Sequence, residues 1–346
     1  MSTIRESLEE KEKSILSPKA ALSGEAKRPR PEKECDLRTA FQKDRDKILH
    51  SKPFRRLKHK TQVFLSPVGD HYRTRLTHTL EVMQIGRTMA RSLHLNEDLV
   101  EAATLGHDLG HTPFGHSGEA ILNKIHPGGF HHAIQSVRII DVIGNNGHRK
   151  GLNLTTEVRE AIQKHSKGKG PILSDDPALK AKTLEGQIVR IADVMAYVNH
   201  DLDDSIRAGV LTLKEVPKEL LQIFGSTHSQ RIETMVKDVI QETIAYDLDK
   251  IRISSEKLDA LNALRAFMFN EVYETDLVQR ELRKAQKVLE SLYQHYLKNS
   301  DQLLAEMSLD EFTDPIDQHV IDYLSGMTDR YAIQKYNELF LPKSWK

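Results

Sequence analysis

The stretch QIVRIADVMAYVNHDLDDSIR, residues 187–207, predicts a long amphipathic helix. Its apolar residues recur every three or four positions, as the helical repeat requires. Its polar residues form a second stripe, which holds Asp193, Tyr197, His200, Asp201 and Asp204. A solvated acidic face explains Asp204 well but Asp193 poorly, because Asp193 stands in an otherwise apolar turn. An unpaired carboxylate is costly there, so the pattern predicts an ionic partner or a metal ion for Asp193.

Helical periodicity continues on both sides of this stretch. Apolar residues recur at helical spacing over 76–93 and 254–304, and Asn96 can cap the helix that follows it. We find no internal repeat and no alternation of strands with helices. The sequence therefore predicts an all-α fold with at most a small β-hairpin near residues 61–75.

The chain divides by composition into three parts. Residues 1–35 are polar and contain prolines, which predicts a mobile or loosely attached arm. Residues 36–210 hold most of the histidines, since twelve of the 17 fall between His50 and His148. We expect a catalytic core there, with residues 211–346 as a helical region packed on it.

Composition excludes several classes of protein. The chain has 346 residues, 38% of them hydrophobic, and no apolar run long enough for a membrane span. Its first residues, MSTIRESLEEKEKS, are charged and unlike a secretory signal. The lone Cys35 cannot form an internal disulfide. These features predict a cytoplasmic protein without membrane attachment.

Charge gives one local indication. The formal net charge is zero, so overall charge does not favour nucleic-acid binding. The segment KPFRRLKHK, residues 52–60, nevertheless has five Lys or Arg in nine positions. Such a run is usually a solvated helix face, and a phosphate-binding groove is the alternative.

The segment GHDLGHTPFGHSGE, residues 106–119, concentrates groups that can bind metal or transfer protons. The dipeptide His107-Asp108 alone is a weak signal. His78 and Asp193, each on a predicted helix, would complete a set of two histidines and two carboxylates. Such ligands suit Mn, Fe, Co, Ni or Zn, and Mg less clearly.

Three segments together resemble the HD-domain metallophosphohydrolases: RTRLTHTLEV, GHDLGHTPFGHSGE and RIADVMAYVNHDLDD. Three more narrow the resemblance to the deoxyguanosine triphosphate triphosphohydrolase (dGTPase-like) family: FQKDRDKILHSKPFRRLKHKTQVF, FHHAIQSVRI and REAIQKHSKG. The matching segments span roughly residues 36–207.

The resemblance implies a role for thirteen residues of this chain. The implied metal ligands are His78, His107, Asp108 and Asp193. The implied catalytic residues are His111, His116 and Glu119. The implied substrate contacts are Arg56, Gln62, Arg75, His132, Tyr197 and Asp201.

The resemblance also implies an activity. The family cleaves a dNTP to a deoxynucleoside and inorganic triphosphate, by attack of metal-activated water at the α-phosphorus. It implies one divalent metal per site (Mn, Mg, Fe, Co, Ni or Zn), with room for a second metal held by the substrate phosphates. We expect His116 to protonate the leaving 5′-oxygen, with Glu119 holding its imidazole. We expect Gly110, Gly115 and Gly118 to let the backbone approach a phosphate.

Family members are oligomers, so a homo-oligomer of even number, such as a hexamer, is expected, together with a dNTP activator. The alternative within HD enzymes, a phosphodiesterase or a (p)ppGpp-type hydrolase, fits the extended match less well. A second alternative is a dNTP sensor or single-stranded nucleic-acid-binding protein with weak or regulated activity, which the basic segment 52–60 keeps open.

Overall fold

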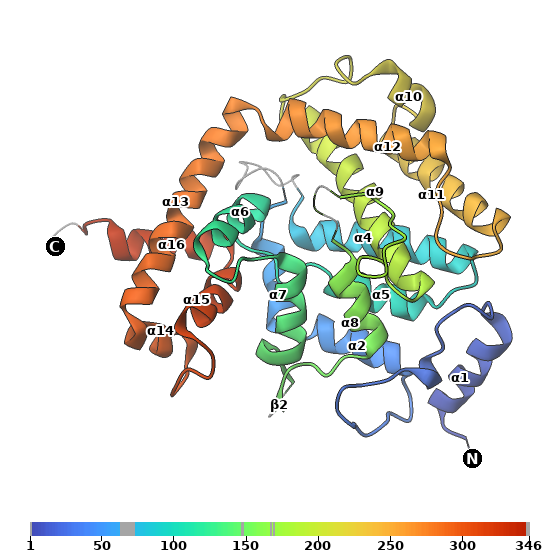
Figure 1. Cartoon of the computed structure of the whole chain (residues 1–346), viewed down its shortest axis with the longest axis horizontal. Helices are drawn as coiled ribbons and strands as arrows, with labels where there is room; N and C mark the ends of the chain where they lie inside the picture. Colours follow the sequence, from blue (N-terminus) through green and yellow to red (C-terminus); the bar gives the residue numbers. More distant parts are fainter. Residues whose placement is uncertain (1, 63–72, 147–148, 167, 169, 344–346) are drawn as a thin grey trace.

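The computed structural model describes residues 2–62, 73–146, 149–166, 168 and 170–343 (Figure 1). These residues form sixteen α-helices, and the predicted all-α fold is confirmed. The predicted hairpin falls largely on residues 63–72, which lie outside the described residues. At its edges, Thr61 and Thr74 form an isolated antiparallel bridge. The strands β1 (Asn145–Asn146) and β2 (Arg149–Lys150) pair antiparallel, and the sequence patterns did not predict them.

Helices occupy the stretches where the periodicity predicts them, which are 76–93, the segment after Asn96, 187–207 and 254–304, and further helices lie outside these stretches. Those before residue 210 are α1 Ile4–Ile15, α2 Ala40–Leu49, α3 Lys52–Arg56, α4 Arg75–Ser92, α5 Glu97–Gly106, α6 Gly115–Ile125, α7 His132–Arg138, α8 Thr156–Lys164 and α9 Leu184–Arg207. The others are α10 Lys218–Phe224, α11 His228–Ala245, α12 Ser255–Met268, α13 Asp276–Lys298, α14 Ser300–Met307, α15 Ile316–Ser325 and α16 Asp329–Phe340. Short 3₁₀ turns are Ser23–Glu25 and Leu57–His59, and π-helical turns are Ile139–Ile143 and Phe269–Tyr273.

Helix α9 lies at the centre of the molecule. It starts where the Thr183 side chain accepts a hydrogen bond from the Gly186 N–H, and it packs against α4, α5, α8, α11 and α12. Most of its polar stripe is also covered, which corrects the expectation of a solvated acidic face. Asp204 is 4% exposed, and its carboxylate pairs with Arg73 at 2.7 Å.

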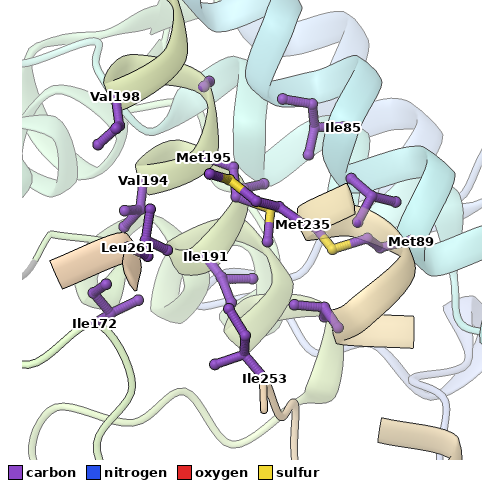
Figure 2. Packing of buried hydrophobic residues seen from close by; sticks show 14 of the residues in the cluster. Ile85, Met89, Ile172, Ile191, Val194, Met195, Val198, Met235, Ile253 and Leu261 are labelled. Atoms are coloured by element: carbon purple, nitrogen blue, oxygen red, sulfur yellow. The ribbon is translucent and has the colours of Figure 1, made fainter. Parts of the chain in front are cut away.

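The largest hydrophobic cluster joins α4, α9, α11 and α12. Figure 2 shows Met89, Met195, Met235 and Leu261 meeting in this cluster. Flexible methionines can fill irregular gaps between helices that cross at different angles. This core fixes α4 and α9, which carry two of the four predicted metal ligands.

A separate cluster is built from the C-terminal helices. Its buried members include Leu289 and Leu292 of α13 and Leu324 of α15. Phe114, from the loop before α6, is buried in the same cluster. The C-terminal helices therefore pack directly on the segment that carries the predicted catalytic histidines.

The N-terminal arm is bonded to the core, in contrast to the prediction of a mobile or loosely attached arm. The Arg28 guanidinium donates to the buried Asp44 carboxylate and to the Asn153 carbonyl. Glu185 Oε1 accepts from the N–H groups of Ala21 and Asn96, each at 3.0 Å. These bonds could not be predicted from composition, because the two partners of each bond lie in different segments of the chain.

Glu32 supplies a pH-dependent attachment for this arm. Its carboxylate lies 2.7 Å from Lys43 Nζ and 2.6 Å from Lys47 Nζ. Partial burial opposes ionisation, but the two lysines outweigh it and lower the pKa of Glu32 from 4.5 to about 2.

Glu32→Gln is expected to lower the free energy of unfolding at pH 7 by about 1–2 kcal/mol, after discounting for solvent screening. The pKa of this carboxyl is lower in the folded protein than in the unfolded chain. Its ionised form therefore stabilises the fold at every pH above the unfolded-state pKa, and that stabilisation is lost as the pH falls toward the folded-state pKa. The difference between variant and wild type should therefore shrink as the pH falls from 4.5 toward 2. Urea titrations across that range test this, with the exposed Glu10→Gln as control. A difference that is constant with pH would contradict the assignment.

None of the helices in the described ranges combines the length and apolar character needed to cross a bilayer.

Candidate active site

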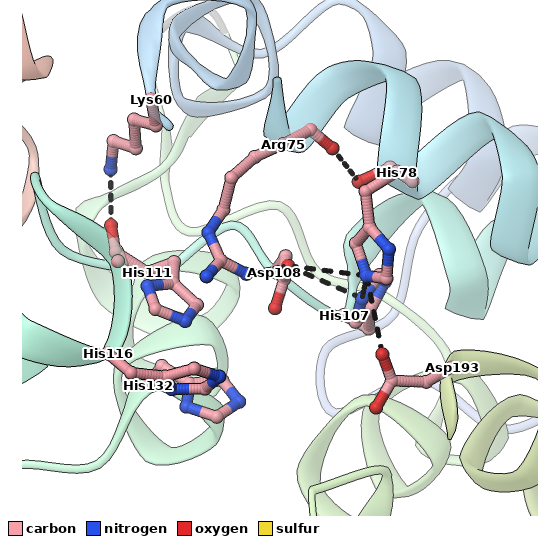
Figure 3. Close-up of polar contacts among 12 residues, drawn as sticks. Lys60, Arg75, His78, His107, Asp108, His111, His116, His132 and Asp193 are labelled. Atoms are coloured by element: carbon pink, nitrogen blue, oxygen red, sulfur yellow. Dashed lines mark hydrogen bonds and ion pairs between the residues drawn. The ribbon is translucent and has the colours of Figure 1, made fainter. Parts of the chain in front are cut away.

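Three helices bring the four predicted metal ligands together. His78 comes from α4, His107 and Asp108 from the end of α5, and Asp193 from α9. In Figure 3 their side chains converge on one point, with the Arg75 guanidinium between Asp108 and His111. His78, His107 and Asp108 are almost fully buried, with exposures of 1%, 0% and 2%.

The ligand atoms are close enough to share one ion. His78 Nε2 lies 3.4 Å from His107 Nε2 and 3.3 Å from Asp193 Oδ1. Asp108 Oδ2 lies 3.5 Å from His107 Nε2 and 3.8 Å from His78 Nε2. One atom each of His78, His107 and Asp108 falls within 4.8 Å of the others.

The far sides of both histidine rings are held by hydrogen bonds. His107 Nδ1 lies 2.6 Å from the Thr104 carbonyl oxygen, so it carries the proton and leaves the Nε2 lone pair facing the cluster. His78 Nδ1 lies 2.8 Å from His200 Nε2. Metal-binding histidines typically have such an outer partner. Imidazole nitrogens and carboxylates gathered in a buried place thus fit a divalent metal ion.

His200 is the outer partner whose loss is easiest to test. It is fully buried, and its Nδ1 lies 2.7 Å from Asp201 Oδ1, without hydrogen-bonding geometry. His200→Ala is expected to weaken Mn²⁺ binding by roughly 10–100-fold, because the His78 ring loses its orienting partner. Calorimetric titration measures this. The control is His126→Ala, a buried histidine bonded to the Tyr293 hydroxyl. An equal loss of affinity in both variants would contradict the role of His200.

Arg75 is positioned to bind an anion beside the metal ligands. It is 2% exposed, and its Nη1 donates to Asp108 Oδ2 at 2.6 Å. Among the described residues, its Nε and Nη2 have no hydrogen-bond partner, and neither has either ring nitrogen of the buried His111. Burial opposes ionisation of Asp108, but His107 and Arg75 outweigh it and hold its pKa well below the usual range. Buried unpaired donors of this kind favour an anionic ligand.

Glu119 connects two histidines of the cluster. Its Oε1 lies 2.9 Å from His132 Nδ1, and its Oε2 lies 3.3 Å from His116 Nδ1. Burial disfavours the carboxylate, but His132 and the hydrogen bond of His116 outweigh it and lower the pKa of Glu119 far below the usual range. Glu119 is therefore ionised.

His165 determines how many protons His132 carries. His165 Nδ1 lies 2.7 Å from the Ile162 carbonyl oxygen and must donate to it. Burial and the neighbouring His107 lower the pKa of His165 well below its usual range, so the ring is neutral and its Nε2 accepts. His132 Nε2 lies 3.2 Å from that acceptor, while His132 Nδ1 faces Glu119. His132 must donate from both nitrogens, as an imidazolium. Burial lowers its pKa, but Glu119 outweighs burial and raises it, in agreement with the geometry.

His116 differs from the other histidines of the cluster in its exposure. Its side chain is 77% exposed, whereas His111 and His132 are 0% and 6% exposed. The His111 and His132 rings stack with centroids 4.7 Å apart, and the His116 ring lies 5.1 Å from that of His111. His116 therefore stands at the border between the buried cluster and solvent.

The other predicted substrate contacts are spread more widely. Tyr197 and Asp201 lie on α9 beyond Asp193, where the Tyr197 hydroxyl accepts from Arg265 and Asp201 Oδ2 accepts from Tyr273 at 2.5 Å. Gln62 lies next to the loop before α6, because a Cβ on Gly115 would stand 3.1 Å from the Gln62 carbonyl oxygen. Arg56 lies beside Lys60, and its Nη1 donates to the Gly326 carbonyl at the end of α15.

Glycines of the loop lie against neighbouring backbone, and the expected approach of the loop to a phosphate stays a prediction. A Cβ on Gly110 would lie 2.2 Å from the Ser136 nitrogen, and one on Gly118 would lie 2.0 Å from the Pro113 carbonyl oxygen. Both positions are needed for close packing of backbone on backbone. Gly115 has a φ of +59°, which an L side chain rarely adopts.

Sequence reasoning assigned no role to His165 or His200. His200 lies on the same helical stripe as Asp193, seven positions later, so the stripe could have indicated that His200 lies close to the metal-ligand candidates. His165 lay in a segment that supported the resemblance, but only the fold brings its ring beside His107 and His132.

Comparison with known proteins agrees with this arrangement. The model of the HD domain matches residues 75–198, and that of the phosphohydrolase-associated domain matches residues 251–338. A deoxyguanosinetriphosphate triphosphohydrolase-like protein of Caldanaerobacter subterraneus subsp. tengcongensis is 52% identical over 343 residues, covering 99% of this chain and 97% of the relative. One from Desulfatibacillum aliphaticivorans is 48% identical, covering 98% and 99%.

Among solved structures, a phosphohydrolase from Bacteroides thetaiotaomicron aligns with 86% of this chain and 68% of its own. Its TM-score is 0.50 at 20% sequence identity, a likeness in fold alone. The two relatives match along nearly their whole length, and the match to the HD domain includes all four predicted ligands. The chain belongs to the deoxyguanosinetriphosphate triphosphohydrolase-like proteins of the HD-domain phosphohydrolase family.

Proposed function

We propose that this protein is a metal-dependent dNTP triphosphohydrolase that cleaves a dNTP, with dGTP as the first candidate, to a deoxynucleoside and inorganic triphosphate. One observation carries the proposal: a buried His/Asp cluster fit for a divalent metal lies beside an arginine with unpaired donors and a second, separate group of histidines around Glu119. The name of the similar relatives supports dGTP as the substrate to test first.

His78, His107, Asp108 and Asp193 would hold the metal ion. When bound, a divalent cation supplies Lewis-acid stabilisation of phosphate charge and a more acidic water. The native metal is proposed to be one of Mn, Mg, Fe, Co, Ni and Zn, which this ligand set accepts.

The chain's own groups supply the remaining requirements of the reaction. Water attacks the α-phosphorus and the bond to the 5′-oxygen breaks, so the leaving oxygen needs a proton. His116 is proposed to give that proton, because its ring is oriented by Glu119 and faces solvent. The imidazolium of His132 and the guanidinium of Arg75 offset the negative charge of the phosphates.

The sugar and base are proposed to lie toward α9. Tyr197 and Asp201 follow Asp193 by one and two helical turns, so a nucleotide with its α-phosphate at the metal cluster reaches them with its sugar. Gln62, close to Gly115, is proposed to contact the nucleotide from the opposite side. Arg56 is proposed as a further substrate contact, with its Nη1 also donating to the Gly326 carbonyl.

The test is product analysis with purified protein. Each dNTP is incubated singly and in pairs with Mn²⁺ or Mg²⁺, and deoxynucleoside and triphosphate are measured. Release of intact triphosphate in a 1:1 ratio with deoxynucleoside is expected. Release of pyrophosphate, or of single phosphates, would contradict the proposed reaction.

The paired incubations also test a dNTP activator, since activation raises turnover of one dNTP when a second is added. Light scattering tests the proposed homo-oligomer of even number. Tight dNTP or single-stranded DNA binding without any hydrolysis would favour the sensor alternative instead.

A further inference from the structure

The loop between the metal-ligand candidate Asp108 and α6 is bonded at both ends to the C-terminal helices. At its start, the His111 carbonyl accepts a hydrogen bond from Lys60 Nζ, which also donates to the Ser325 carbonyl at 2.7 Å. At its end, the Phe114 N–H donates to Asp329 Oδ1 at 2.9 Å. Ser325 ends α15 and Asp329 begins α16, so both anchors lie in the region that matches the phosphohydrolase-associated domain.

Both oxygens of the Asp329 carboxylate accept hydrogen bonds from residues outside the C-terminal helices. Besides the Phe114 N–H, it accepts from the Thr61 N–H at 3.1 Å and from Thr61 Oγ1 at 2.6 Å, both at Oδ2. Asp329 is 2% exposed, so water does not replace these donors. Hydrogen bonds to an ionised acceptor are the stronger kind, and removing the acceptor leaves backbone N–H groups buried without a partner.

Lys60 is an unusual residue to find buried. It closes the basic segment 52–60 but is 1% exposed, and burial together with the neighbouring Arg56 lowers its pKa to about 7. Its donors go to the two backbone carbonyls of His111 and Ser325. This lysine therefore joins segments of backbone and is not available to a nucleic acid.

The backbone between the two anchors needs to be held. Phe114 has a φ of +62°, a conformation that a bulky L residue rarely adopts, and Gly115 follows at +59°. Such a backbone persists where the surroundings fix it. The Phe114 ring is buried among C-terminal residues such as Leu289. Helix α6 begins at Gly115 and carries His116 at its second position.

We propose that Asp329 is a positioning residue for the reaction. By holding Phe114 in the left-handed conformation, Asp329 sets where α6 starts and therefore where His116 and Glu119 stand relative to the metal ligands. The C-terminal region thus takes part in the chemistry through one carboxylate. The activity part of this inference rests on the proposed function.

Asp329→Asn is the sharpest test, because it keeps the shape and removes one acceptor. Whichever way the amide is turned, either the Phe114 N–H or the Thr61 N–H then faces an NH₂ group. Asp322→Asn is the matched control. Asp322 is also buried in α15 and also bridges to the core, but its core partners are Gln135 and Arg138 of α7.

Two measurements distinguish a positioning role of Asp329 from a general loss of protein stability. Amide exchange of a peptide that contains Phe114 is expected to speed up about tenfold in Asp329→Asn and to stay unchanged in Asp322→Asn. kcat for dNTP hydrolysis is expected to fall on the order of 10²-fold in Asp329→Asn, with Mn²⁺ affinity retained. Thr61→Val, which removes only the hydroxyl donor, should show a smaller change in the same direction and serves if Asp329→Asn does not fold.

Equal kcat values for Asp329→Asn and Asp322→Asn would overturn the proposal, as would faster exchange at Phe114 without loss of kcat. If the wild-type protein releases no triphosphate, the proposed function fails by itself. In that case unchanged exchange at Phe114 in Asp329→Asn would still overturn the anchoring, and faster exchange would support it.

Discussion

Asp108→Ala is expected to remove both the bound metal and turnover, leaving less than roughly 10⁻³ of the wild-type rate, a loss of about 4 kcal/mol in transition-state stabilisation. Asp108 Oδ2 lies within 4 Å of both histidine nitrogens, at 3.8 Å from His78 Nε2 and 3.5 Å from His107 Nε2. It also pairs with Arg75, so the substitution removes a ligand and frees a buried cation at once. Metal content by atomic spectroscopy and kcat by triphosphate release measure the two effects.

The loss of a buried ion pair needs its own control. Asp204→Ala provides it, because the Asp204 carboxylate is also buried and also lies 2.7 Å from an arginine, Arg73, outside the histidine cluster. Both variants should lose stability to urea, and only Asp108→Ala should lose its metal. Metal-dependent turnover retained in Asp108→Ala would refute the ligand assignment.

His116→Ala is expected to slow hydrolysis by about 10²–10⁴-fold while metal affinity stays close to that of the wild type. The ring is 77% exposed, so its removal creates no cavity and the free energy of unfolding should hardly change. The slowing should appear in kcat, because the proton is needed only as the 5′-oxygen leaves.

Single-turnover kinetics with a dNTP and Mn²⁺ measure that step directly. His59→Ala is a suitable control, since His59 is an exposed histidine in the turn after α3. A rate unchanged in His116→Ala would assign the proton donor to another group of the cluster.

The fold class and the predicted metal ligands could be derived from the sequence because their signals are local. The 3.6-residue period predicted α9, and Asp193, a carboxylate in an otherwise apolar turn of that helix, predicted an ionic partner or a metal ion. The helix that follows Asn96 was visible for the same reason, since a cap and its helix are neighbours in sequence.

Contacts between distant segments could not be derived in this way. Lys60 looked like one more member of a basic surface run, and its burial depends on the Ser325 carbonyl far along the chain. The neighbouring sequence gave no indication that Asp329 contacts a distant segment, because an aspartate at the start of a helix is common. The hydrogen bond from Arg56 to the Gly326 carbonyl could not be predicted either, because it depends on where α15 ends.

The doubly protonated His132 has a consequence for proton supply. Its two N–H groups are engaged by Glu119 and His165, so neither of them bonds directly to the His116 ring. In the proposed reaction His116 can be recharged from bulk solvent, because its ring is exposed. The proposal therefore assigns different tasks to the two parts of the histidine cluster: the buried His132 keeps its protons during turnover, and the exposed His116 exchanges its proton with solvent.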